Sequence, residues 1–198
     1  GINRTLVQMQ VTEEVDSSFV MTGISDVMTD SSQIDQKTGT DLLNKMVQKA
    51  RAKQMEAQQQ KQAANAEKYA DNKKAGEDFL EKNKQRPEVK ETASGLQYEV
   101  LKKGTGASPE ATDKVKVHYH GTLIDGTVFD SSVERGEPIT FGLNQVIAGW
   151  TEGVQLMKEG AKYKFYIPQD LAYGNTDKGE IKPYSTLIFE VELLEVVE

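Results

Sequence analysis

The 198-residue sequence contains no cysteine, and this absence excludes several kinds of chemistry. Disulfides, thiol nucleophiles and cysteine-ligated zinc sites are ruled out. The absence does not identify a compartment, because both oxidising and reducing spaces accept proteins without cysteine. The sequence also lacks a run of about 18 apolar residues, which a membrane-spanning helix would need. We therefore expect no transmembrane segment.

An excess of basic residues is also missing. The formal net charge is −7, with 14 basic against 15 acidic residues in 1–92 and 10 against 16 in 93–198. Binding to nucleic acid depends on a basic face that neutralises phosphates. Neither half of the chain offers one, so nucleic acid is not an expected partner.

Proline is scarce in the first half, and its distribution predicts a long helix. No proline lies between the candidate N-cap residues Thr40 and Asp41 and the stop at Pro87. A helix over about 41–84 would be roughly 65 Å long. Its apolar stripe fades into a glutamine-rich middle at 58–62, which is typical of a helix that crosses solvent. Gly76, which costs about 1 kcal/mol in a helix, is the candidate position for a kink. A coiled coil remains the alternative, although apolar heptads are not sustained through the glutamine-rich part.

The first residues of the chain predict short helices. Apolar residues recur at positions 19, 20, 24, 27 and 28, with Asp16 or Ser17 as N-cap. A module of about 50 residues is too small to fold reliably alone. We therefore predict a homodimer formed through residues 1–50. The expected organisation is a helical dimerisation module at 1–39, a long connecting helix at 40–86, a linker at 87–93 and a C-terminal domain at 94–198.

The periodicity changes to that of strands from Ser94 onward. Apolar residues alternate with polar ones around Tyr98, around Val117, and over 162–167, and 187–197 is typical of a long terminal strand. A short helix-like stretch runs from Gln145 to Met157. One helix among five or so strands predicts an α+β domain, in which a curved antiparallel sheet wraps around a short helix.

Aromatic and branched apolar residues of this domain are grouped around a few polar ones. The groups are Val117-His118-Tyr119-His120-Gly121, Val128-Phe129-Asp130-Ser131-Ser132, Val146-Ile147-Ala148-Gly149-Trp150, Ala172-Tyr173-Gly174 and Thr186-Leu187-Ile188-Phe189. Such a collection can line a small, dry pocket with few polar anchors. The sequence therefore predicts a site for an apolar ligand.

These groups, together with Ser94-Gly95-Leu96-Gln97-Tyr98, resemble the FKBP family of peptidyl-prolyl cis-trans isomerases over residues 94–198. The preceding long helix resembles a two-domain bacterial branch related to the macrophage infectivity potentiator. The resemblance implies a V-shaped homodimer with catalytic domains at its tips. It also implies rotation about X–Pro bonds in folding proteins, which requires neither a proton transfer nor a nucleophile, so we expect no cofactor.

The resemblance also implies roles for particular residues. The expected catalytic set is Tyr119, Asp130, Trp150 and Tyr173. The expected substrate-binding set is Phe129, Ile139, Phe141, Val146, Ile147, Ile181 and Phe189. Trp150 would be the floor on which proline sits, the Ile147 N–H would donate to a substrate carbonyl, and the Tyr173 hydroxyl would do the same. Ordinary core packing is the alternative for each apolar residue.

Asp130 is expected at the pocket edge, in contact with Tyr119. The alternative is an aspartate that caps the turn before Ser131 and Ser132. Ile139 stands where many single-domain members have an aromatic residue, for which Phe141 is expected to compensate. The loop at 179–185 carries extra charge, which bears on substrate preference and on affinity for macrolide drugs.

His118 and His120 are two residues apart and fall on one strand face. They could suit a metal, but no third ligand is evident, so we interpret them as solvent-facing and expect no metal. The expected partners are proline-containing unfolded or partly folded polypeptides, a second copy of the chain and macrolide inhibitors. A non-enzymatic holdase or assembly scaffold is the alternative function. We expect the bacterial cell envelope or periplasm as the location, with the cytoplasm as the alternative; the start at Gly1 leaves open an upstream signal or anchor segment.

Overall fold

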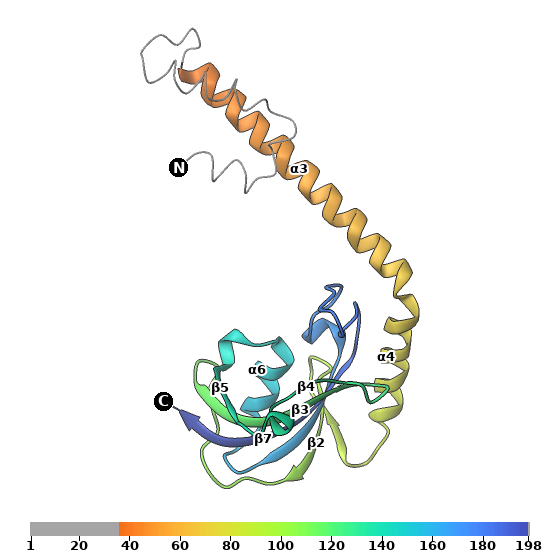
Figure 1. The fold of residues 1–198 in the computed structure, drawn as a ribbon, viewed down its shortest axis with the longest axis vertical. Helices are drawn as coiled ribbons and strands as arrows, with labels where there is room; N and C mark the ends of the chain where they lie inside the picture. Colours follow the sequence, from red (N-terminus) through yellow and green to blue (C-terminus); the bar gives the residue numbers. More distant parts are fainter. Residues whose placement is uncertain (1–35, 198) are drawn as a thin grey trace. The chain divides into compact units, whose positions relative to one another are not determined.

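The structure is a computed structural model that describes the backbone of residues 36–197 and the side chains of residues 44–197 (Figure 1). The helix expected over 15–28 and most of the module expected at 1–39 lie outside the described residues. The chain divides into two units, Gly1–Gln62 and Ala63–Glu198. The second unit thus begins upstream of residue 94, and the four-part organisation remains a prediction.

Two helices occupy the region in which the sequence predicts one. Helix α3 spans Gln36–Lys68 and helix α4 spans Ala70–Asn83. Residues 51–64 are all exposed, which agrees with their glutamine-rich composition. Among the described residues, no helix is long and apolar enough to cross a membrane.

The interruption between the helices lies at Tyr69, so the kink predicted at Gly76 is wrong. Tyr69 has φ −113° and ψ 23°, outside the helical range. Gly76 is buried inside α4, where a Cβ atom would lie 2.4 Å from Thr186 Oγ1. Gly76 is therefore a point of close packing, and the missing side chain makes room for Thr186.

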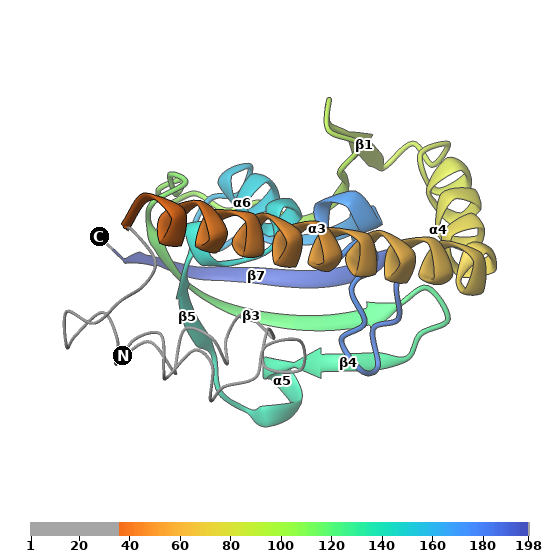
Figure 2. The same ribbon diagram turned by 90° about the horizontal axis from the view of Figure 1, so that it is seen from above.

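Seven antiparallel strands form the sheet of the C-terminal domain, in the order β1-β2-β6-β7-β3-β4, with β5 also paired to β3. The strands are β1 Val89–Glu91, β2 Gln97–Lys102, β3 Lys114–Leu123, β4 Val128–Ser131, β5 Ile139–Gly142, β6 Lys162–Ile167 and β7 Leu187–Val197. The long strands β3 and β7 run side by side through the middle (Figure 2). The α+β fold class is confirmed, and β6 and β7 have the bounds that alternation predicted.

Helix α6, Ala148–Gln155, lies against the sheet and closes the core. Cβ atoms on Gly149 and Gly153 would lie 2.4 Å from Ile167 and 2.7 Å from Phe165, so these glycines let the helix approach β6 closely. Trp150 lies between them in the sequence and is buried. The close approach of α6 therefore fixes the position of Trp150 above the strands.

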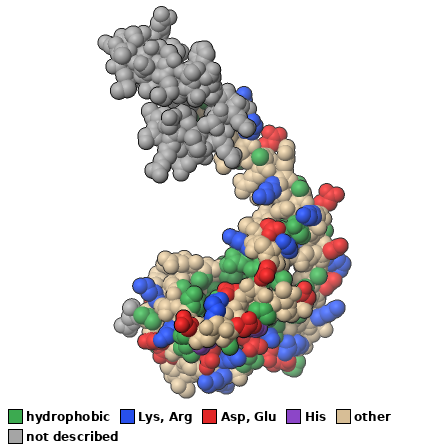
Figure 3. Space-filling view, viewed as in Figure 1, with side chains coloured by type: hydrophobic (Ala, Val, Ile, Leu, Met, Phe, Trp, Pro, Cys, Tyr) green, Lys and Arg blue, Asp and Glu red, His purple; other side chains and the backbone are tan. Residues whose placement is uncertain are grey.

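Three short elements complete the domain. They are the helix α5, Ser132–Arg135, and the 3-10 turns η1, Leu143–Gln145, and η2, Gln169–Leu171. The Ser131 hydroxyl caps α5 by accepting the Glu134 backbone N–H at 3.2 Å. Acidic and basic side chains are interspersed over the visible face of the domain, without a continuous basic patch there (Figure 3).

Candidate active site

A hollow of about 680 Å³ opens between α6, the sheet and the loop that precedes β7. Its volume is within the range of ordinary small-ligand sites. Its lining residues are Tyr119, Phe129, Asp130, Ile139, Phe141, Gln145, Val146, Ile147, Trp150, Tyr173, Lys178, Ile181 and Phe189. Most of these side chains are apolar, and the charged ones are Asp130 and Lys178.

Trp150 is surrounded by three other rings. Its ring centroid is 5.1 Å from Phe141, 5.1 Å from Phe189 and 5.5 Å from Tyr119. The rings of Tyr119 and Phe189 stand edge to face against the indole, at 88° in both cases. Such tilted contacts are the favoured aromatic arrangement and fix each ring. Trp150 lines the hollow and is only 4% exposed, so most of its surface is covered by its neighbours.

The close packing of these rings depends on Gly121 in β3. A Cβ atom there would lie 2.8 Å from both Phe129 and Phe189. Because the position has no side chain, the two rings meet over the strand at 5.3 Å and 83°. The sheet thereby presents a continuous apolar wall to the hollow.

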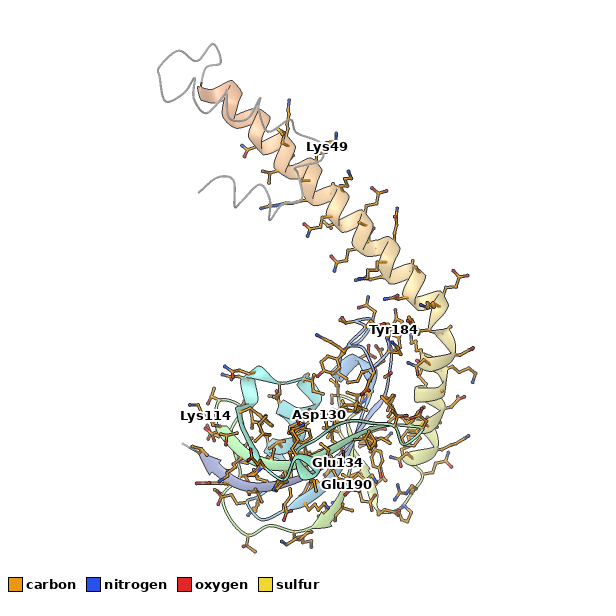
Figure 4. All side chains as sticks on the ribbon, in the orientation of Figure 1. Lys49, Lys114, Asp130, Glu134, Tyr184 and Glu190 are labelled. Carbon is orange, nitrogen blue, oxygen red and sulfur yellow. The ribbon has the colours of Figure 1, made fainter. Side chains whose placement is uncertain are left out.

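Asp130, which is labelled in Figure 4, lies at the edge of this wall. Its carboxylate forms a network with Tyr119 and Arg135. The Tyr119 hydroxyl and the Arg135 guanidinium both donate to the Asp130 carboxylate. Arg135 also donates to the Tyr119 hydroxyl at 3.0 Å. The side chain that caps α5 is that of Ser131, whereas the contacts of the Asp130 carboxylate with Tyr119 and Arg135 are those expected at the edge of the hollow.

The network keeps Asp130 ionised and Tyr119 neutral. Burial alone would raise the pKa of Asp130, but the hydrogen bonds from Tyr119 and Arg135 outweigh it, and the pKa lies below its ordinary value. Burial, and then the neighbouring Asp130 carboxylate, raise the pKa of Tyr119. Both pKa values move away from neutrality, so neither group is suited to proton transfer there.

The opposite wall is formed by the loop between η2 and β7. Lys178 and Ile181 pair with each other through a bridge in which the Lys178 N–H donates to the Ile181 carbonyl at 3.0 Å. The Lys178 ammonium lies 5.4 Å from the ring centroid of Tyr173, a cation–π distance. This loop therefore adds a cation to a mostly apolar hollow whose other charged lining residue is Asp130.

All eleven residues predicted for the site lie around this one hollow. Ile139 is 38% exposed and lies at the rim, while Phe141 contacts the indole. Among the described residues, none accepts a hydrogen bond from the Ile147 N–H, so that donor is available. The individual roles of these residues remain predictions.

Sequence reasoning missed Gln145, Lys178 and Arg135. Lys178 lies in a loop and Gln145 ends a 3-10 turn of three residues, and in such short segments no periodicity indicates the direction of a side chain. Arg135 follows Asp130 by five residues and has the opposite charge. The cap at Ser131 and the single turn of α5 lie between them, and this spacing of opposite charges is the one sequence signal for their contact.

The two histidines differ from their predicted environment. Both are half-buried rather than fully solvent-facing, and each lies within hydrogen-bond distance of a serine. His118 Nδ1 lies 3.1 Å from Ser132 Oγ, and His120 Nδ1 lies 3.0 Å from Ser131 Oγ. Within residues 44–197, no group of three or more histidine, aspartate or glutamate side chains is placed to hold a metal ion.

Comparison with known proteins gives two family matches. Residues 106–194 match the family described as FKBP-type peptidyl-prolyl cis-trans isomerase. Residues 2–100 match the domain described as amino terminal to FKBP-type peptidyl-prolyl isomerase. The two matches together span nearly the whole chain.

Individual relatives agree with these matches. The chain is 47% identical over 189 residues to FKBP-type peptidyl-prolyl cis-trans isomerase FkpA of Aeromonas hydrophila, covering 96% of the chain and 68% of that protein. It is 49% identical over 130 residues to the outer membrane protein MIP of Legionella longbeachae, covering 65% and 56%. The crystal structure of FkpA from Escherichia coli is similar with a TM-score of 0.66 and 36% identity, covering 99% of the chain and 89% of that structure.

Proposed function

The chain belongs to the FKBP-type peptidyl-prolyl cis-trans isomerase family, and we propose that the hollow over Trp150 is the place where it catalyses rotation about X–Pro bonds. As a member of that family, it is an isomerase. The observation that carries the assignment of the site is the ring-lined hollow, whose charged groups stand at its edges.

The reaction is a rotation against amide resonance. The barrier is about 18–20 kcal/mol, because the nitrogen lone pair is delocalised into the carbonyl. Uncatalysed exchange takes about 10–100 s. Acceleration to milliseconds, about ten-thousandfold, requires roughly 5–6 kcal/mol of transition-state stabilisation.

An apolar hollow can supply this stabilisation without proton transfer. The planar amide is strongly dipolar, whereas the twisted amide has lost that charge separation. Removal from water therefore penalises the ground state more than the transition state, and a shape that fits the twisted form adds to the difference. Trp150, Phe141 and Phe189 would form the surface on which the proline ring rests.

The polar groups would hold the peptide on either side of that ring. The Ile147 N–H, which has no acceptor among the described residues, would donate to a substrate carbonyl. The Tyr173 hydroxyl would donate to another. Asp130, held by Tyr119 and Arg135, would fix the edge of the wall and present a permanent negative charge to the reacting bond.

We further propose that the substrates are exposed X–Pro bonds in unfolded or partly folded polypeptides, and that the chain acts as a homodimer through residues 1–50. The match over residues 2–100 to the amino-terminal domain of this family supports the dimer. Two catalytic domains in one particle would raise the effective concentration for a second contact with the same client. We also propose a location in the cell envelope, because the Legionella longbeachae relative is an outer membrane protein by name.

A proline-peptide exchange assay with matched hydroxyl deletions tests the site. Tyr173→Phe should lower kcat/KM by about threefold to tenfold if its hydroxyl holds the substrate. Tyr163→Phe removes the same atom from a ring that donates to the Leu156 carbonyl outside the hollow, and should leave the rate unchanged. Equal rates for both variants and the wild type would contradict the proposed role of Tyr173.

A third variant, Trp150→Leu, distinguishes catalysis of exchange from a holdase activity that does not need the hollow. Trp150→Leu should abolish most catalysis of exchange, while suppression of client aggregation persists. If catalysis by Trp150→Leu equals that of the wild type in a folded protein, the hollow is not the catalytic site. A sedimentation mass of one chain at micromolar concentration would contradict the dimer.

A further inference from the structure

The face that the last turn of α3 and the helix α4 turn toward the C-terminal domain is rich in asparagine and contains a buried glycine. The less exposed positions from residue 63 to residue 83 are Asn65, Tyr69, Asn72, Gly76, Phe79, Leu80 and Asn83. This spacing of three and four residues describes one face of a helix. The less exposed face therefore combines apolar residues with three asparagine hydrogen-bond donors placed at helical intervals.

The C-terminal end of this face is attached to the sheet. The Asn83 side chain donates to Gln97 Oε1 at 2.9 Å, and Gln97 donates in turn to the Leu80 carbonyl at 3.0 Å. The Phe79 ring lies 5.9 Å from the ring of Tyr166. These contacts fix α4 on the scaffold of the domain.

The other part of the face is attached to residues 174–186, which we call the pocket loop. Asn72 Nδ2 donates to the Pro183 carbonyl at 2.7 Å and also lies 3.1 Å from Ser185 Oγ. Asn65 Nδ2 donates to the Asn175 carbonyl at 3.0 Å. The last turn of α3 and the first turn of α4 thus bind the loop near both of its ends.

The pocket loop has a conformation that needs such support. Tyr184, labelled beside α4 in Figure 4, has φ 63° and is the one residue other than glycine with positive φ in the part of the chain that the structure describes. This backbone region is unfavourable for a residue with a side chain and persists where the surroundings hold it. The Tyr184 N–H closes the base of the loop by donating to the Gly174 carbonyl at 2.7 Å. The tip carries Lys178 and Ile181, which line the hollow.

We propose that α4 holds the pocket loop in place and that Asn72 is a positioning residue for substrate selection. Asn72 does not line the hollow, so it acts through Pro183 and the loop. Its bond determines how far Ile181 and Lys178 extend over the hollow. The helix that leads into the catalytic domain is therefore also the outer support of one wall of its site. This inference rests on the proposed function of the hollow.

The expected loss of substrate affinity follows from the equilibrium between two positions of the pocket loop, one held by Asn72 and one displaced. Loss of the donor leaves the Pro183 carbonyl without this partner, which weakens the held position by about threefold to tenfold. Substrate affinity is proportional to the fraction of molecules in which the loop is held, so it falls by up to the same factor. The loss should appear mainly in KM and should be larger for substrates with a bulky residue before proline, because those reach the loop.

The experiment uses the full chain with three variants. Asn72→Ala removes the donor. Asn72→Asp keeps the shape but turns a carboxylate oxygen toward the Pro183 carbonyl, so it should displace the loop further. Asp71→Ala removes a side chain of the same size from the adjacent exposed position and is the matched control. For each, kcat and KM are measured on two peptides, with alanine or leucine before proline, and unfolding is followed in parallel.

We expect the leucine-to-alanine ratio of kcat/KM to change by about threefold or more in both Asn72 variants, with Asn72→Asp the more affected, and to stay unchanged in Asp71→Ala. Acrylamide should quench the fluorescence of Trp150, the only tryptophan, more strongly in the Asn72 variants because the hollow opens. If folded Asn72→Ala and Asn72→Asp keep the wild-type ratio and KM, the positioning role is refuted. That result is distinct from failure of the proposed site, which Trp150→Leu reports separately.

Discussion

Replacement of Gly76 by alanine has two opposite effects on the free energy of unfolding. Helix propensity stabilises the folded state, and packing against Thr186 destabilises it. In a solvent-exposed helix, glycine to alanine stabilises by about 1 kcal/mol. At Gly76 the new Cβ would lie 2.4 Å from Thr186 Oγ1. Overpacking of this kind costs about 1–3 kcal/mol. Gly76→Ala should therefore lower the free energy of unfolding by between about zero and 2 kcal/mol, although alanine is the better helix former.

The Thr186→Ala background removes the clashing atom and reverses the sign. The next nearest atom is Thr186 Cβ at 3.3 Å, a contact that a small shift relieves. In that background Gly76→Ala should stabilise by up to about 1 kcal/mol. The double-mutant cycle should thus give a coupling energy of about 1–3 kcal/mol.

Urea unfolding of the full chain measures these differences, with Trp150 fluorescence as a probe of the unit that contains both residues. The slope against denaturant should be the same for all four proteins, so that the midpoints report stability alone. Stabilisation by Gly76→Ala to the same extent in both backgrounds would refute the packing of α4 against Thr186.

Three further predictions follow from the site and from the division of the chain. Lys178→Met should lower kcat/KM for a peptide with glutamate before proline by about twofold to fivefold and leave a neutral peptide unchanged, because exposed ion pairs contribute about 0.2–1 kcal/mol; an equal loss on both peptides would exclude charge selection by Lys178. The lowered pKa of Asp130 means that its ionised form adds stability above the unfolded value of about 3.9, and this stability is lost as pH falls through the folded-state pKa. Asp130→Asn should therefore reduce stability near neutrality and flatten the acid side of the stability curve; an acid side that keeps the wild-type slope in this variant would refute that assignment. Removal of residues 1–62 should spare catalysis on tetrapeptides and reduce it on protein clients, and an equal effect on both substrates would contradict the contribution of the dimer.

The sheet and the composition of the site could be predicted because both depend on apolar side chains in regular patterns. Alternation gave the bounds of β6 and β7, and the motifs around Tyr119 and Trp150 pointed to one hollow. Apolar residues on one face of a strand must turn toward the same core, so their spacing carries spatial information.

The role of α4 could not be predicted in the same way. Its contact face depends on Asn72 and Asn83, and the preceding turn of α3 adds Asn65; hydropathy patterns treat all three as solvent-facing residues. Gly76 was interpreted through its backbone cost, whereas its importance comes from Thr186, which lies 110 residues away in the sequence. Hydrogen bonds and close approaches between distant segments leave no local periodicity.

The most direct test of the central claim compares kcat/KM for a leucyl-proline peptide in H₂O and in D₂O, across about pH 6 to 9, where general acid–base catalysis would show itself. Because the hollow around Trp150 favours a twisted amide without moving a proton, the rates in the two solvents should coincide and stay constant over this range. A slower rate in D₂O, together with a bell-shaped pH profile, would show that a titrating group transfers a proton and would contradict the account.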